Sequence, residues 1–264
     1  MQTCDPEAAQ TFAREGLSAG WAISQVINRQ TFRWMDSDAY LFDIDGTLLV
    51  TQDLVHWNAL RTAMREVYGA DTNIDGIPYH GKTDLGILRA AMARVGVEGE
   101  RFESGLPVAL EVVCREVALN ASSINANVCT AVRDILTRLR DAGKLLGVAS
   151  GNLKSVGWHK VEAAGLRDFF TFGCFSDSAE LRADIFREAV KQTRRRLGEQ
   201  ATVCFIGDTP EDVRAARAAN AKIIAVSTGT FSYTELSSFN PDLCIASCGD
   251  LLARGNEVAN DVSA

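Results

Sequence analysis

Apolar residues recur along this chain in two rhythms. Short apolar runs that end on polar residues alternate with amphipathic segments after residue 130, and one more such run lies near residue 40. Near-continuous apolar strands alternating with helices are typical of a parallel sheet covered on both faces. We therefore predict strands at residues 36–43, 145–150, 202–208, 222–229 and 243–246, and a short one within residues 169–175.

Between the first two strands the spacing is helical throughout. Apolar positions three and four residues apart predict a helix ending at Gly69, one between the segment at residues 80–84 and Gly96, and one over residues 106–119. Residues 6–30 carry a similar pattern ahead of the first strand. The predicted fold is α/β, a doubly wound parallel sheet with an inserted all-helical cap. Its parts are an N-terminal helical extension (1–36), an α/β core (37–54 and 126–264) and the cap (55–125).

Composition narrows the function classes. A net charge of −7 does not suggest a nucleic-acid-binding surface. No apolar run is long enough to cross a membrane, and the N-terminus carries acids where a signal peptide carries lysines. The seven cysteines form no CxxC pair, so neither a zinc site nor a redox motif is supported. They are scattered, odd in number and mostly set in apolar stretches, and we expect reduced thiols. We expect a cytoplasmic enzyme with no nucleic-acid or membrane partner, and we leave its oligomeric state open.

The candidate chemistry begins at the end of the first strand. Asp43 follows the apolar residues Tyr40 to Phe42 directly, and Asp45 follows two positions later. A buried strand that ends on two acids indicates a cation beside them. In open parallel sheets, ligands bind outside the carboxyl ends of the strands. Two later strands also end on polar residues: Ser150, Gly151 and Asn152 follow one, and Asp208 and Asp212 the other.

These strand ends resemble three motifs of the haloacid dehalogenase superfamily of phosphohydrolases. FDIDGTLL is similar to its first motif, VASGN to its second and IGDTPEDV to its fourth. The similarity runs from Asp38 to about Leu252. It is strongest to the phosphoglycolate-phosphatase-like branch, whose GRTD-like cap segment corresponds to Gly81–Asp84.

The resemblance implies a role for each motif residue. Asp43 would be the nucleophile that forms an aspartyl-phosphate, and Asp45 the general acid and base. Mg²⁺ would be held by Asp43, Asp208 and the Asp45 backbone carbonyl, with Asp212 holding a metal-bound water. The phosphate of a small phosphorylated metabolite would be bound by Thr47, Ser150, Gly151 and Asn152.

The third motif supplies a cation to the nucleophile and is a lysine in most relatives. Arg182 stands at that place in the sequence, and Lys160, on the helix after SGN, is the alternative. A guanidinium performs the same electrostatic task with a forked geometry.

Some of these residues have ordinary interpretations as well. Asp212 also suits a helix start. Lys82 and His80, in the cap segment, are either substrate contacts or surface residues. His56 and His159 are expected to be packing or surface residues.

The function predicted is Mg²⁺-dependent hydrolysis of a small phosphate monoester, either phosphoglycolate-like or a sugar phosphate. Asp45 counts against a dehalogenase, which lacks the second acid. A phosphosugar mutase, a phosphonate hydrolase using Lys82 as a Schiff base, and a non-catalytic phosphometabolite-binding module remain alternatives.

Overall fold

The computed structural model describes residues 32–260, apart from the side chains of Ser178 and residues 255–260. The helix predicted over residues 6–30 lies outside the described residues. In chain order the elements are β1 (Ala39–Phe42), β2 (Leu49–Thr51), α1 (Val55–Tyr68), α2 (Asp84–Ala93), α3 (Gly99–Leu119), η2 (Ala121–Ser123), β3 (Ala126–Val128), α4 (Val132–Asp141), β4 (Leu145–Ala149), α5 (Lys154–Ala163), η3 (Arg167–Phe169), β5 (Phe172–Cys174), η4 (Ser176–Ser178), α6 (Arg182–Leu197), β6 (Val203–Gly207), α7 (Pro210–Ala218), β7 (Lys222–Val226), α8 (Tyr233–Ser238), β8 (Leu243–Ile245) and α9 (Gly249–Asn260).

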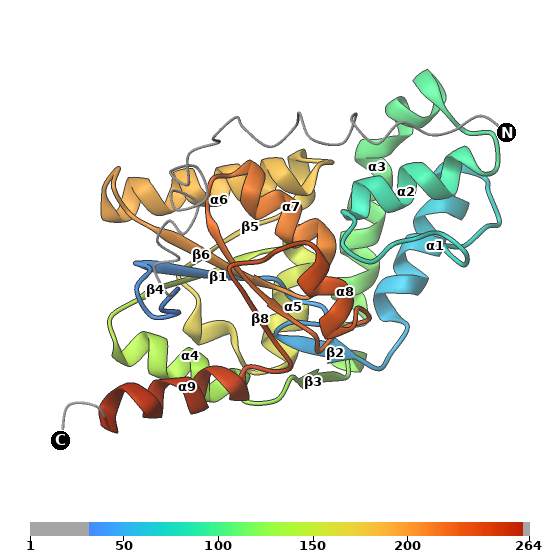
Figure 1. Cartoon of the computed structure of the whole chain (residues 1–264). Coiled ribbons are helices and arrows are strands. Elements are labelled where there is room, and N and C mark those ends of the chain that lie inside the picture. Colours follow the sequence, from blue (N-terminus) through green and yellow to red (C-terminus); the bar gives the residue numbers. More distant parts are fainter. Residues whose placement is uncertain (1–31, 261–264) are drawn as a thin grey trace, which may run out of the picture. The chain divides into compact units, whose positions relative to one another are not determined.

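The main sheet has the strand order β5-β4-β1-β6-β7-β8, and every pairing in it is parallel. The chain starts at β1 in the middle of the sheet and builds outward on both sides, so the predicted doubly wound α/β class is confirmed. Helices α6 and α7 lie on one face and α4 and α9 on the other (Figure 1). All four residues of β1 are buried, as expected for a strand covered on both faces.

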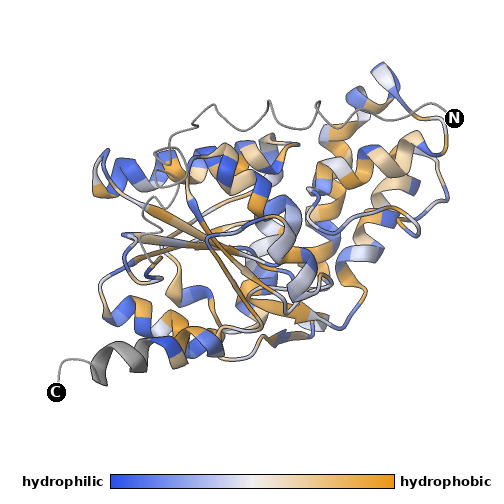
Figure 2. Ribbon diagram, viewed as in Figure 1, coloured by the Kyte–Doolittle hydropathy of each residue, from blue (hydrophilic) through white to orange (hydrophobic). Residues whose placement is uncertain are grey.

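The core of the sheet is packed with large apolar side chains. The strands are the most hydrophobic part of the fold, and the helices turn polar residues outward (Figure 2). Phe186 of α6 stacks on Phe205 of β6, with ring centroids 3.9 Å apart and an interplanar angle of 10°. Both rings are at most 1% exposed.

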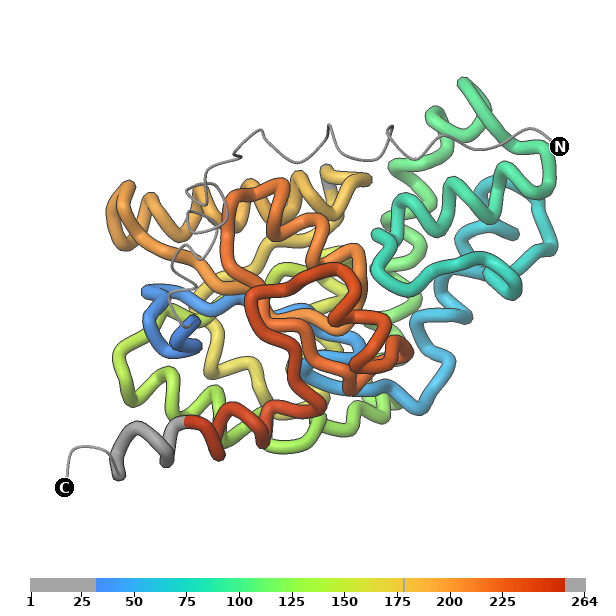
Figure 3. The backbone as a smooth tube through the Cα atoms, viewed as in Figure 1, coloured from blue at the N-terminus to red at the C-terminus, as the bar shows by residue number. Residues whose placement is uncertain are grey.

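A helical insertion, α1 to α3, lies between β2 and β3 (Figure 3). Its helices enclose an apolar cluster of their own, which includes Leu60, Met64, Leu88 and Phe102 and extends to Leu153 at the start of α5. The two chain segments that join the insertion to the sheet pair with each other as an antiparallel ribbon, β2 with β3.

Several element bounds differ from those predicted. The ribbon of β2 and β3 was not expected, because three-residue strands carry too little alternation to be recognised in sequence. Helix α3 begins at Gly99 rather than at residue 106, since its polar first turns offer only Phe102 as a buried apolar residue. Strand β1 is shorter than residues 36–43, and β7 ends at Val226 rather than at residue 229. No helix among residues 32–260 has the length and apolar character needed to cross a membrane.

Truncating Phe186 to alanine tests the packing of α6 on the sheet. We expect Phe186→Ala to lower the free energy of unfolding by about 3–5 kcal/mol, because it removes a buried ring and leaves a cavity. Leu197→Ala, at the exposed end of the same helix, is the matched control and is expected to lose less than about 1 kcal/mol. Urea denaturation measures both, and equal losses would contradict the packing described.

Candidate active site

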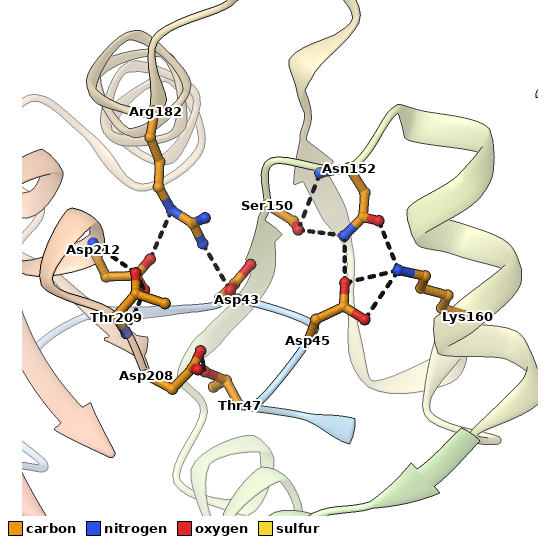
Figure 4. A network of polar contacts seen from close by, with 10 residues as sticks. All are labelled: Asp43, Asp45, Thr47, Ser150, Asn152, Lys160, Arg182, Asp208, Thr209 and Asp212. Carbon is orange, nitrogen blue, oxygen red and sulfur yellow. Dashed lines mark hydrogen bonds and ion pairs between the residues drawn. The ribbon is translucent and has the colours of Figure 1, made fainter. Parts of the chain in front are cut away.

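Strand register brings three motif segments to one edge of the sheet. Phe42 of β1 lies beside Val148 of β4 and Ile206 of β6. The residues that follow these strands, Asp43, Ser150 and Asp208, therefore emerge side by side (Figure 4). All three are at most 5% exposed and line a cavity of about 570 Å³.

Three buried acids form a cluster at this edge. Asp43, Asp208 and Asp212 each offer a carboxylate oxygen, and these oxygens lie within 4.8 Å of one another. Glycines allow the loops to approach so closely. A Cβ on Gly46 (φ +83°) would lie 2.3 Å from Asp208 Oδ2, and one on Gly229 would lie still nearer to that oxygen. Side chains at these two positions would displace Asp208.

Arg182, at the first position of α6, reaches into the acid cluster. Its Nη2 lies 2.7 Å from Asp43 Oδ2, and its Nε lies 2.8 Å from Asp212 Oδ1. The other Asp212 oxygen accepts hydrogen bonds from the backbone N–H and hydroxyl of Thr209, at 3.0 and 2.6 Å. Both oxygens of Asp212 are thus engaged by protein groups, and Arg182 bridges Asp212 to Asp43.

Among the described residues, the buried cluster holds three acids but only one guanidinium. Burial raises the pKa of Asp43 to about 6, although the Arg182 guanidinium acts in the opposite direction. Burial, and next the charge of Asp43, raises the pKa of Asp208 well above its ordinary value. A single guanidinium does not compensate three carboxylates taken out of water.

Asp45 points away from this cluster into the cavity. Its side chain is 42% exposed, and its two oxygens lie 2.9 and 2.8 Å from Lys160 Nζ. Asn152 Nδ2 donates to Asp45 at 2.8 Å, while Asn152 Oδ1 accepts from Lys160 at 2.9 Å. The surrounding protein disfavours the charge on Asp45, but Lys160 and Asn152 outweigh this and lower the pKa of Asp45. The two candidate cations therefore face different acids: Arg182 faces Asp43, and Lys160 faces Asp45.

The candidate phosphate-binding residues surround Asp43 and Asp45. Thr47, fully buried, donates its hydroxyl to Asp208 Oδ1 at 3.1 Å. The Ser150 hydroxyl accepts from Asn152 Nδ2 at 2.9 Å. A Cβ on Gly151 would lie 2.3 Å from the Lys82 carbonyl oxygen, so this glycine permits close contact with the helical insertion.

Lys82 and His80 enter the cavity lining from the loop that precedes α2. The His80 ring lies 3.2 Å from the Thr230 hydroxyl, measured at Nδ1. Lys82 is exposed, and among the described residues its ammonium has no hydrogen bond or ion pair. The loop is fixed to the core beside them: Asp84 N donates to the Gly151 carbonyl at 2.8 Å, and Thr83 Oγ1 donates to the Glu180 carbonyl at 2.7 Å.

Two residues of the site, His56 and Asp84, have partners that the sequence does not indicate. His56 of α1 contacts Lys160 Nζ through Nδ1 at 3.2 Å and Asp84 Oδ1 through Nε2 at 3.2 Å. Asp84 also accepts from Leu153 N at 2.7 Å. The sequence predicts only a helix residue at position 56 and a helix start at position 84, and neither pattern indicates these partners.

The donor set of the acid cluster fits a hard divalent cation. Asp208 Oδ2 accepts no hydrogen bond among the described residues, whereas Oδ1 accepts from Thr47. Buried carboxylate oxygens without protein donors are the ligands that Mg²⁺ prefers. A divalent ion here would also compensate the excess charge that raises the pKa values of Asp43 and Asp208.

Several known proteins are similar to this chain in sequence or in fold. Pyrophosphatase PpaX of Bacillus velezensis is 26% identical over 218 residues, which cover 81% of this chain and 94% of that protein. Among solved structures, a predicted phosphoglycolate phosphatase of Haemophilus somnus superposes with a TM-score of 0.61 at 17% identity, covering 83% of this chain and 98% of that one. CbbY of Rhodobacter sphaeroides, in complex with phosphate, gives a TM-score of 0.57 at 18% identity, with coverage of 80% and 94%.

A family model identifies the chain more firmly than these individual proteins do. The model for haloacid dehalogenase-like hydrolases matches residues 40–226, which include all three motif segments and the helical insertion. The sequence resemblance stated above is therefore confirmed, and the protein is a member of the haloacid dehalogenase-like hydrolase family.

Proposed function

We propose that this protein is a Mg²⁺-dependent phosphatase that hydrolyses small phosphate monoesters through an aspartyl-phosphate on Asp43. The observation that carries the proposal is the separation of two acids with different surroundings. Asp43 is buried against Arg182 in the acid cluster, while Asp45 faces the cavity beside Lys160. A nucleophile and an acid–base group need such separate environments.

Asp43 and Asp208 would hold the metal ion with their carboxylates, and the Asp45 backbone carbonyl would complete the protein ligands. When bound, the ion would supply positive charge that stabilises the negative charge on the phosphate oxygens during attack by Asp43. Asp212, with both oxygens engaged, holds Arg182 and Thr209 in place and would contact the ion through water.

In the first step Asp43 attacks phosphorus, the P–O bond to the leaving alcohol breaks, and the alcohol oxygen takes a proton from Asp45. In the second step Asp45 accepts a proton from the water that attacks phosphorus, the P–O bond to Asp43 breaks, and inorganic phosphate leaves while Asp43 returns to a carboxylate. The ionised form of Asp45, which Lys160 and Asn152 favour, suits this second step. Ser150 and the N–H groups of Gly151 and Asn152 would bind the phosphate oxygens, with Thr47 keeping Asp208 in position.

The helical insertion would serve as the cap that excludes water from this site, with domain bounds as the sequence predicts. Its loop at Gly81–Asp84 lies on the second-motif loop, and it carries Lys82 and His80 into the lining. We assign Lys82 to attraction of the anionic substrate, because its ammonium is uncommitted among the described residues. Pyrophosphate should be assayed beside phosphate monoesters, because the Bacillus velezensis relative is named a pyrophosphatase.

Replacing Asp43 tests the nucleophile. We expect Asp43→Asn to lower kcat for phenyl phosphate in Mg²⁺ by on the order of 10³-fold or more, because the amide cannot form the acyl-phosphate. Asp71→Asn, at a side chain that is 77% exposed, is the matched control and should keep full activity. Full turnover by Asp43→Asn, or no turnover by the wild type, would refute the phosphatase proposal.

Exchanging the cation tests the role of Arg182. A lysine at position 182 cannot contact Asp43 and Asp212 at the same time as the forked guanidinium does. We expect Arg182→Lys to lower kcat/KM by about 10²-fold. Arg187→Lys, five residues further along α6 at an exposed side chain, is the control. Unchanged kcat/KM in Arg182→Lys would assign the third-motif role elsewhere, with Lys160 as the next candidate.

Charge removal at Asp208 tests the metal site without an activity measurement. The raised pKa of Asp208 means that its ionisation destabilises the metal-free protein above the unfolded-state pKa. In EDTA at pH 7.5, we expect Asp208→Asn to raise the free energy of unfolding, because the amide removes a carboxylate whose charge is disfavoured in the folded protein. The gain should disappear below pH ~4, where the carboxyl is protonated in both states.

Added Mg²⁺ should stabilise the wild type more than the variant. It should raise the melting temperature of the wild type by more than that of Asp208→Asn, because the variant lacks a ligand. An Asp208→Asn variant less stable than the wild type in EDTA, or an equal Mg²⁺ effect on both proteins, would count against a metal at this cluster.

A further inference from the structure

The cavity over the sheet edge has two chemically different sides. Every lining residue from the loops that follow β1, β4, β6 and β7 is polar or glycine, Asp43, Ser150 and Thr228 among them. The opposite side comes from the segment between Val50 and Ile87, and we call it the insertion wall. Its apolar members include Val50, Leu54, Trp57, Ile74, Tyr79 and Ile87.

The insertion wall leaves large apolar side chains open to water at the cavity. Leu54 is 62% exposed, and Val50 and Tyr79 are each 43% exposed. Val50 belongs to β2, Leu54 directly precedes α1, and Tyr79 lies in the loop before α2, yet all three line one cavity. Exposed apolar residues that gather at a hollow mark a binding surface rather than ordinary surface scatter.

Most polar groups of the insertion wall are already engaged. Asp53 accepts from Val55 N at 2.8 Å and from Asn125 N at 2.7 Å. His56 and Asp84 contact each other, and His80 contacts Thr230. Among the described residues, the wall therefore offers a ligand few free polar side chains, with Lys82 as the principal one.

The insertion wall is held against the core in the structure. Arg89 of α2 contacts Glu180 Oε1 through Nε at 2.7 Å and Oε2 through Nη2 at 2.9 Å. Asp84 and Thr83 bind the core backbone beside it. The cavity of about 570 Å³ thus exists with the wall already docked, and its size is within the range of pockets that enclose whole organic ligands.

We propose that the phosphate monoester hydrolysed here carries an apolar leaving group, an alkyl or aromatic alcohol, which packs on Leu54, Trp57 and Tyr79 of the insertion wall. This inference rests on the proposed phosphatase function and specifies its substrate class. A sugar would place several hydroxyls against side chains that cannot hydrogen-bond them, which is costly. A two-carbon glycolate would leave most of the cavity unfilled and the wall in contact with water.

A series of straight-chain alkyl phosphates tests this proposal. Ethyl, butyl and hexyl phosphate share nearly the same leaving-group reactivity, so differences in kcat/KM report contacts of the chain. Full burial of one methylene corresponds to about fourfold in kcat/KM. We expect at least a tenfold rise from ethyl to hexyl phosphate, and hexyl phosphate should exceed glucose 6-phosphate and phosphoglycolate.

Paired variants locate the effect on the insertion wall. In the double variant Leu54→Ala, Tyr79→Ala, the hexyl-to-ethyl ratio of kcat/KM should fall severalfold toward one. The matched control is Leu119→Ala, Tyr233→Ala, which removes a somewhat more exposed leucine and tyrosine (72% and 51%) outside the cavity lining and should keep the ratio. Thermal melting confirms that both variants fold.

Binding of the corresponding alkylphosphonates in Mg²⁺, measured by calorimetry, separates this proposal from the phosphatase proposal. If no ester is hydrolysed but affinity rises from ethyl- to hexylphosphonate, the phosphatase proposal fails and the apolar wall stands. If esters are hydrolysed with no dependence on chain length, or if phosphoglycolate or glucose 6-phosphate is preferred, the apolar leaving group is refuted. A ratio that falls equally in the Leu119, Tyr233 control also refutes it.

Discussion

The site depends on the two ion pairs that Arg182 makes at the edge of the sheet. Arg182 lies between Asp43 and Asp212, and its guanidinium is the cation that lets three carboxylates be buried together. Asp212 in turn closes the capping box that begins α7 with Thr209. The start of α6, the start of α7 and the end of β1 are therefore held in one arrangement. The uncompensated charge that remains supports a proposed divalent ion as part of the working enzyme.

Small residues make this arrangement sterically allowed. Asp208 lies between Gly46 and Gly229, and a Cβ on Gly207 would lie 2.4 Å from the Asp212 carboxyl carbon. Gly46 and Gly229 lie in two different loops and Gly207 is the last residue of β6, so the room for the acids is built by the fold and not by one motif. Thr228, beside Gly229, donates its hydroxyl to the Gly46 carbonyl at 2.6 Å and ties the two loops together.

A chain of contacts joins the core to the helical insertion. Asp45 contacts Lys160, Lys160 contacts His56, and His56 contacts Asp84, which also accepts from the backbone of Leu153. The candidate acid–base group, Asp45, is thus connected to α1 and α2, the helices that carry several residues of the insertion wall. In the proposed enzyme, the position of the insertion and the surroundings of Asp45 depend on each other.

The sequence by itself determined the fold class, the family and the order of the strand-end acids, because these follow from local patterns: apolar runs, helical spacing and short motifs. Only the tertiary structure decided which cation faces which acid. Lys160 lies 115 positions from Asp45, and His56 lies 104 positions from Lys160. Such pairs leave no periodicity in the chain, since they depend on strand register and on where the insertion lies. For the same reason, the short β2–β3 ribbon and the insertion wall could be recognised only in the folded structure, where distant segments lie together.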